Sequence, residues 1–214
     1  MELKRQKTYK DVFEKACSDI LHGMGIEEKL FRAGLKCEKI DSLLKISVPF
    51  FDELITLTLP SFTFISSRET NITLVTRIII LHYINTASGT PLTGERVAYG
   101  DIPACMHYDP VYERRVLKPL VRAFGFDKYA FREAGQSLQA KDEEFGDAAF
   151  TLFAFPKVPI TFIIWEGDEE FAPRARALFD PSVTGYLPLE DLVVISKLAS
   201  GRILKAAMKN ISED

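Results

Sequence analysis

Cysteine is scarce in this 214-residue chain, which contains three, at Cys17, Cys37 and Cys105. They stand far apart, and the sequence holds no C-x-x-C pair. A disulfide framework, a structural zinc site or an iron–sulfur centre each needs clustered cysteines. We therefore predict three free thiols, as a reducing cytoplasm favours.

The chain also lacks an excess of one charge and a long apolar run. It has 27 Lys and Arg against 30 Asp and Glu, a net charge of -3. This balance does not suit nucleic-acid binding, whose affinity comes from neutralised phosphates. The most apolar stretch, 72–84, is interrupted by Arg77 and His82 and falls short of the ~20 apolar residues of a membrane-spanning helix.

The charged segment 1–10 has no apolar core and so does not resemble a signal peptide. We expect a cytoplasmic protein that binds neither a membrane nor nucleic acid, and the sequence leaves its oligomeric state open.

Core-forming residues are plentiful by contrast. Hydrophobic residues make up 47% of the chain and sixteen residues are Phe. A chain of this size buries about 70% of its unfolded surface, so no disulfide or metal is needed for stability. We expect one domain over residues 1–214.

Hydrophobic periodicity predicts the elements of this domain. Helical spacing indicates N-terminal helices over 8–33, a central helix over 70–87, helices over 111–138 and a C-terminal helix over 188–210. Alternating and β-favouring residues predict a hairpin over 43–59 and two interior strands over 148–165. The expected fold is α+β, a mostly antiparallel sheet packed with a buried central helix and flanking helices.

Some local patterns lead to finer expectations. Ser66–Glu69 resembles a capping box and is predicted to start the central helix. Residues 62–65 favour a short third strand, and 141–146 a charged turn. Arg174–Leu178 is compatible with either a strand or a helix.

The common catalytic and cofactor motifs are absent. There is no G-x-G-x-x-G, no G-x-x-x-x-G-K-[ST], no G-x-S-x-G and no H-E-x-x-H. Three histidines, His22, His82 and His107, are few for a metalloenzyme. The sequence therefore assigns no cofactor and no metal site.

An acidic turn follows the second interior strand. Glu166, Asp168, Glu169 and Glu170 come directly after Trp165, the one tryptophan. Such carboxylates can bind Mg²⁺ or Ca²⁺, hold a cationic group, or form an acid/base pair. They can equally form a solvated turn.

His82 lies near the end of the predicted central helix. It is either a hydrogen-bonded core residue or a ligand or base tuned by burial. Polar side chains at the ends of buried elements can reach solvent from a rigid backbone. We therefore expect a binding pocket between this helix end and the acidic turn, formed by His82, Tyr83, Trp165, Glu166, Asp168 and Glu169.

Two further groups carry weaker hypotheses. Cys105 and His107 can share a soft metal, or Cys105 is simply a buried thiol. A basic helical segment can receive an anion or form a solvated helix face, and its members are Arg114, Arg115, Lys118 and Arg122.

Several stretches together resemble an uncharacterised prokaryotic family catalogued as domain of unknown function 3786. They are His82–Gly94, Phe155–Pro159, Trp165–Phe171, Leu178–Asp180 and Tyr186–Asp191. The resemblance extends from Tyr9 to about Leu204. It implies an occurrence mainly in anaerobes and a context of corrinoid and iron–sulfur systems, but no activity. This chain has no cysteine-rich module with which to hold a cluster alone.

Two functional hypotheses follow. The first is a non-catalytic accessory protein of anaerobic metabolism that binds a cofactor, a metal centre, a small molecule or a protein partner. The alternative is a small enzyme that uses His82 and a carboxylate of the 166–170 turn as an acid/base pair. They are distinguished by whether His82 lies within hydrogen-bonding reach of such a carboxylate.

Overall fold

The computed structural model describes residues 2–22, 25–103 and 105–213, and the chain divides into two compact units. Unit 1 consists of Met1–Pro91, Phe155–Lys157 and Ser182–Pro188. Unit 2 consists of Leu92–Ala154, Val158–Pro181 and Leu189–Asp214. Both combine helices with an antiparallel sheet, so the α+β fold is confirmed. The expected single domain stays a prediction, because two compact units can still fold as one.

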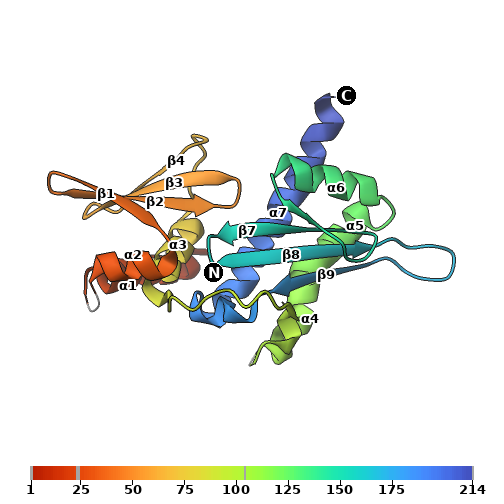
Figure 1. The fold of residues 1–214 in the computed structure, drawn as a ribbon, viewed down its shortest axis with the longest axis horizontal. Helices are drawn as coiled ribbons and strands as arrows, with labels where there is room; N and C mark the ends of the chain where they lie inside the picture. Colours follow the sequence, from red (N-terminus) through yellow and green to blue (C-terminus); the bar gives the residue numbers. More distant parts are fainter. Residues whose placement is uncertain (1, 23–24, 104, 214) are drawn as a thin grey trace. The chain divides into compact units, whose positions relative to one another are not determined.

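Unit 1 contains three helices and one four-stranded sheet among its described residues (Figure 1). In chain order the elements are α1 (Glu2–Leu21), α2 (Ile26–Ala33), β1 (Lys36–Ile40), β2 (Leu43–Phe50), β3 (Glu53–Leu59), β4 (Thr63–Ser66) and α3 (Leu74–Thr86). The strands pair in sequence order, β1-β2-β3-β4, and each pair is antiparallel.

The alternating residues of β2 and β3 produce a sheet with one buried face. Ile46 lies opposite Leu57 and Val48 opposite Ile55, and all four are fully buried. The residues between them are more exposed. Period-two alternation places every second side chain on the core side, so the predicted hairpin forms as expected.

One local expectation in unit 1 was wrong, and one strand was not expected. The capping box Ser66–Glu69 does not start α3, because the Ser66 hydroxyl instead donates to Glu53 and accepts from the Arg68 amide. The helix begins at Leu74, and the Thr73 side chain caps it by accepting from the Thr76 amide. Strand β1, which the sequence did not indicate, is exposed at all five positions and so carries no hydrophobic alternation.

Unit 2 contains the second sheet and the remaining helices. Its elements are β5 (Val97–Ala98), η1 (Tyr99–Asp101), η2 (Met106–Tyr108), α4 (Asp109–Tyr112), η3 (Glu113–Leu117), α5 (Lys118–Phe124), α6 (Lys128–Ser137), β6 (Lys141–Glu143), β7 (Ala148–Phe155), β8 (Val158–Trp165), β9 (Arg174–Phe179) and α7 (Leu189–Glu213). A short 3-10 helix, η4 (Pro181–Gly185), precedes α7 in the chain, and its residues 182–185 belong to unit 1.

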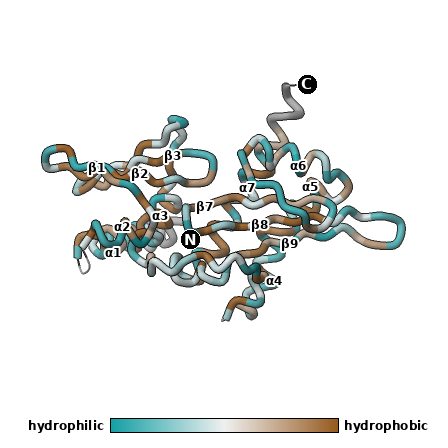
Figure 2. The backbone as a smooth tube through the Cα atoms, viewed as in Figure 1, coloured by the Kyte–Doolittle hydropathy of each residue, from teal (hydrophilic) through white to brown (hydrophobic). Residues whose placement is uncertain are grey.

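The sheet of unit 2 has the strand order β5-β9-β8-β7-β6. Strands β7 and β8 are interior and have the predicted bounds, and Figure 2 shows both as mainly hydrophobic. The ambiguous segment after the acidic turn is strand β9. Residues 141–143 form β6 rather than part of a turn, since they pair with 149–151 of β7.

Aromatic side chains form the core of unit 2 between the sheet and α6. Phe150 of β7 stacks on Phe131 of α6, with ring centroids 4.5 Å apart, and Phe162 of β8 lies 6.4 Å from Phe150. All three are fully buried. Gly135 of α6 allows this approach, because a Cβ there would lie 2.5 Å from the Phe150 ring.

The helical stretch 109–124 contains one turn of π-helix, η3. The Lys118 amide donates to the Glu113 carbonyl, five residues back. Pro119 accounts for this turn, because proline has no N–H to donate and its ring collides with the carbonyl four residues earlier. The Ser200 hydroxyl of α7 donates to the Val116 carbonyl at 3.1 Å and so joins α7 to the π turn.

Candidate functional site

The structure places the helix end of the predicted pocket in unit 1. Tyr83 is fully buried, its hydroxyl donates to the Ala33 carbonyl at 2.6 Å, and its ring stacks on Phe155 at 4.2 Å. Burial raises the pKa of Tyr83 well above its usual value. These contacts give Tyr83 a role in the core of unit 1. His82 is half-buried on the same helix.

The acidic turn lies in unit 2, where local contacts account for two of its carboxylates. Glu166 pairs with the Lys128 ammonium at 2.9 Å and accepts the Lys128 amide. These hydrogen bonds lower the pKa of Glu166. Asp168 accepts the amides of Glu170 and Phe171, which lowers the pKa of its carboxyl. The hydrogen bonds of Glu166 and Asp168 therefore stabilise the conformation of this turn.

The other two residues of this segment are less constrained. Trp165 is half-buried and lies 5.8 Å from the Arg174 guanidinium in a cation–π contact, whereas Glu169 is exposed. Because the helix end and the acidic turn belong to different units, the pocket of His82, Tyr83 and residues 165–170 stays a prediction.

The described residues contain no group of three or more His, Cys, Asp or Glu that could hold a metal ion. The metal hypotheses for the acidic turn and for Cys105 with His107 consequently gain no support. His107 is exposed and Cys105 is buried. The three cysteines are free, as predicted, and Cys37 is exposed.

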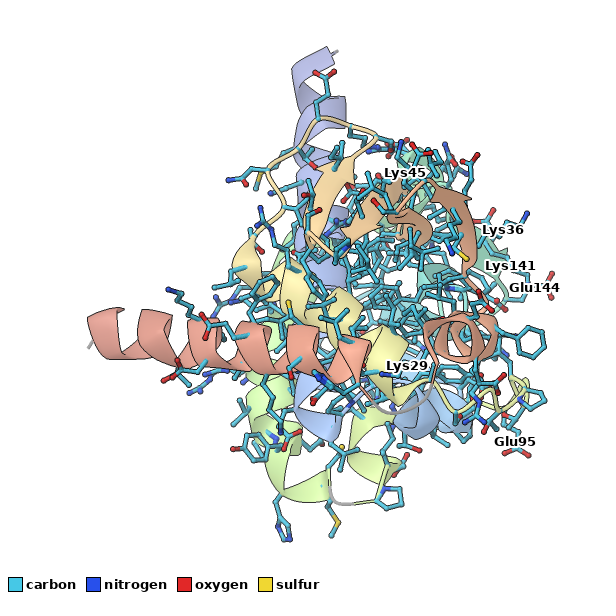
Figure 3. All side chains as sticks on the ribbon, turned by 90° about the vertical axis from the view of Figure 1, so that its left-hand side faces the viewer. Lys29, Lys36, Lys45, Glu95, Lys141 and Glu144 are labelled. Carbon is cyan, nitrogen blue, oxygen red and sulfur yellow. The ribbon has the colours of Figure 1, made fainter. Side chains whose placement is uncertain are left out.

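A buried lysine in unit 1 has a structural explanation. The Lys29 ammonium donates to the Asp19 carbonyl of α1 and to the Asn85 Oδ1 of α3 at 3.0 Å. Figure 3 shows this side chain beside the end of α1 and next to α3. Burial lowers the pKa of Lys29. Its donors satisfy the carbonyls that the end of a helix leaves unpaired.

A small polar cavity on the sheet of unit 2 is closed by its own contacts. Arg96 pairs with Glu143 at 2.9 Å, Thr151 donates to Glu143 at 2.9 Å, and Thr151 and Thr161 share a hydrogen bond of 2.7 Å. Burial opposes ionisation of Glu143, but hydrogen bonds from Thr151 and Lys141 and the charge of Arg96 lower its pKa. The space is about 130 Å³, and its polar groups satisfy one another.

A larger cleft, of about 400 Å³, lies entirely within unit 2 between β9 and the helical stretch that contains the π turn. This volume is at the low end of the range for ligand sites. Its lining residues are Ala98, Tyr99, Gly100, Asp101, Asp109, Tyr112, Glu113, Leu117, Lys118, Val121, Pro173, Arg174, Ala175, Arg176 and Ala177.

One wall of the cleft is a pair of stacked tyrosines. The rings of Tyr99 and Tyr112 are 4.2 Å apart and nearly parallel, at 7°. Both residues are buried, and burial raises the pKa of each hydroxyl, so both stay protonated at neutral pH. Cys105 lies behind them within hydrogen-bonding reach of Tyr99, and burial raises the pKa of its thiol. This stack is aromatic and uncharged, and it exposes little surface to the cleft, because Tyr99 is 4% and Tyr112 1% exposed.

Charges of both signs surround this wall. Three carboxylates come from η1 and the helical stretch, and three cations from α5 and β9: Asp101, Asp109, Glu113, Lys118, Arg174 and Arg176. None forms an ion pair with another described residue. These charges are available to a ligand. A Cβ on Gly100 would lie 3.0 Å from the Asp109 carboxyl carbon, so a larger residue would crowd this end of the cleft.

Sequence analysis identified one of these lining residues as a binding candidate, Lys118 of the basic group. Arg114, Arg115 and Arg122 of that group are exposed and do not line the cleft. A sequence signal existed in the two prolines, Pro110 and Pro119, because a proline within a helical pattern marks an irregular turn. Such π turns occur often at functional sites.

The comparisons with known proteins yield a family without an assigned activity. A family model described as Domain of unknown function (DUF3786) matches residues 26–202. The chain therefore belongs to this family, and the resemblance seen in the sequence is confirmed. Curated proteins and solved structures provide no match. Within the described part of the chain, no helix has both the length and the apolarity of a membrane span.

Proposed function

We propose that the chain is a non-catalytic binding protein whose partner or ligand occupies the cleft of unit 2. One observation supports this best: a single cleft is lined by six charged side chains that have no ion-pair partner among the described residues, next to a buried pair of stacked tyrosines. Binding sites commonly combine apolar walls with a few convergent polar groups.

Binding is favoured over catalysis by the chemistry of the lining. Acid/base and nucleophilic catalysis generally employ a histidine, a poised carboxylate or an activated thiol. The lining contains neither histidine nor cysteine, and its two tyrosines have raised pKa values, so only its carboxylates, Asp101, Asp109 and Glu113, remain for acid/base chemistry. The alternative enzyme with His82 gains no support, because Glu166 and Asp168 are engaged locally.

The resemblance to its family adds a context to this proposal. We infer that the protein works in the cytoplasm of an anaerobe, next to corrinoid or iron–sulfur systems, and that it binds neither nucleic acid nor membranes. The volume of about 400 Å³ suits a small molecule or a short peptide segment better than a whole tetrapyrrole.

The test is to select ligands for the full chain from a fragment set and from a random-peptide library, and to remeasure them on two variants. Ala175→Phe fills the cleft, whereas Ala123→Phe places the same ring on an exposed part of α5 outside it. Selected ligands should lose about tenfold or more in affinity for Ala175→Phe alone. Equal binding to all three proteins, or no ligand from either collection, would contradict the proposal.

A further inference from the structure

Strand β9 has a partner along only part of one side. On the β8 side, all six residues of β9 are paired, from Arg174 opposite Trp165 to Phe179 opposite Ile160. On the other side, β5 pairs only with Leu178 and Phe179. No described strand lies along residues 174–177 on that side.

The open part of this edge faces the cleft. After Ala98 the chain leaves the sheet and turns into η1, so the ladder between β5 and β9 stops. The four residues it leaves unpaired, 174–177, all line the cleft. An edge strand presents backbone N–H and C=O groups on its free side, which makes it a template for another extended chain.

Along residues 174–177, charged arginine side chains alternate with small apolar alanine side chains. Arg174 and Arg176 are exposed and lie on one face of the sheet, opposite Trp165 and Ile163 of β8. Ala175 and Ala177 lie on the other face, where Ala175 is half-buried and Ala177 is buried.

From this alternation we propose that the cleft binds an extended peptide segment of a partner protein, which pairs with residues 174–177 as an additional strand. The segment alternates acidic and apolar residues. Its carboxylates lie beside Arg174 and Arg176 as cross-strand pairs. Its apolar side chains face the helical wall, where Tyr112, Leu117 and Val121 line the cleft. Addition of a strand to an open sheet edge is a common mode of peptide recognition.

The same arginines argue against a second copy of this chain as the occupant. Two copies paired through this edge would bring four arginines onto one short ladder, and charged residues on an edge strand disfavour such self-pairing. The two arginines favour carboxylates on a strand paired with this edge, whereas Asp101, Asp109 and Glu113 of the same cleft come from η1 and the helical stretch. This inference rests on the proposed function, because it assigns the occupant of the same cleft.

The experiment uses the full chain and three fluorescein-labelled octapeptides. The first alternates Glu and Val, the second Lys and Val, and the third Glu and Pro. The Glu/Pro peptide has the same charges as the Glu/Val peptide, but its proline residues have no backbone N–H to donate in strand pairing. Fluorescence anisotropy should show the Glu/Val peptide binding about tenfold or more tightly than either of the others.

A charge-reversed protein is the matched variant. Arg174→Glu combined with Arg176→Glu changes two exposed side chains and leaves the cleft lining otherwise intact. It should weaken binding of the Glu/Val peptide by about tenfold and strengthen binding of the Lys/Val peptide. Amide hydrogen exchange of the wild-type chain should slow within 174–177 when the Glu/Val peptide is present.

Each of the following results would overturn the inference. Equal binding of the Glu/Pro and Glu/Val peptides would mean that charge alone attracts them, and a dimer that the charge-reversed variant abolishes would make a second copy the occupant. If selected fragments bind in the cleft but the Glu/Val peptide does not, the peptide inference fails while the proposed function stands. If nothing binds in the cleft, both fail.

Discussion

Tyr99 and Tyr112 stack face to face in unit 2, with ring centroids 4.2 Å apart and planes inclined by 7°. One comes from the 3-10 turn after β5, and the other ends α4, directly before the π turn. The stack therefore joins the two segments that form the cleft opposite β9.

The Tyr112 ring should matter for stability far more than its hydroxyl. The hydroxyl is buried, and the nearby Ser196 hydroxyl donates to the Leu192 carbonyl rather than to it. Tyr112→Phe removes an unsatisfied polar group and should leave the free energy of unfolding unchanged or raise it by about 1 kcal/mol. Tyr112→Ala should lower it by about 3–5 kcal/mol because a cavity forms. Urea denaturation measures both, and a loss above about 1 kcal/mol for Tyr112→Phe would contradict this assignment.

Two glycines in helices of unit 2 should respond oppositely to alanine. A Cβ at Gly135 would lie 2.5 Å from the buried Phe150 ring, so Gly135→Ala should destabilise the protein by about 1–3 kcal/mol. A Cβ at Gly201 of α7 would meet no atom within 4 Å, so Gly201→Ala should stabilise the protein by up to about 1 kcal/mol. Equal changes in the melting temperature of Gly135→Ala and Gly201→Ala would contradict the packing of α6 on the sheet.

Phe162 should be a central residue of the second sheet. It is fully buried, whereas Phe153 on the neighbouring strand is 44% exposed. Phe162→Ala should cost about 3–5 kcal/mol through lost burial and a cavity, and Phe153→Ala should cost clearly less. Urea denaturation of both variants tests the order, and a loss below about 1 kcal/mol for Phe162→Ala would show that β8 is not part of the core.

Cys17 should make stability depend on pH in the alkaline range. Burial, together with the nearby Glu14 charge, raises the pKa of its thiol from 9.0 to about 11. The folded state thus retains a proton that the unfolded state releases, so the contribution is complete below pH 9.0 and disappears as pH rises through about 11. Cys17→Ala should flatten this part of the curve.

Alkylation by iodoacetamide provides an independent check of the thiols. Exposed Cys37 should react before Cys17 and before buried Cys105 at pH 8–9. Faster labelling of Cys17 than of Cys37, or a stability curve that Cys17→Ala does not change, would contradict the environment assigned to Cys17.

Elements with a strong hydrophobic pattern could be predicted from the sequence. Strands β7 and β8 have the expected bounds because nearly all of their side chains are buried. Strand β1 could not be predicted, since all five of its residues are exposed and its position depends on pairing with β2. The start of α3 was misplaced because two hydroxyl residues, Ser66 and Thr73, compete as caps and tertiary contacts decide between them.

The cleft could not be predicted from the sequence, because the fold brings its lining together from separate segments. Its lining comes from three segments, 98–101, 109–121 and 173–177, and no local pattern joins them. Arg174–Leu178 was ambiguous as a sequence because arginine and alanine alternate there without a clear strand signal. Pairing with β8 makes it a strand, and the early end of β5 leaves its edge open.

The most direct test of the account is an amide chemical-shift map of the ¹⁵N-labelled full chain, titrated with the Glu/Val octapeptide and with the ligands selected from the fragment and peptide collections. The largest shifts should fall on 98–101, 109–121 and 173–177, and Ala175→Phe should remove them while Ala123→Phe does not. Shifts that fall elsewhere, or that persist in Ala175→Phe, would contradict the assignment of this cleft as the binding site.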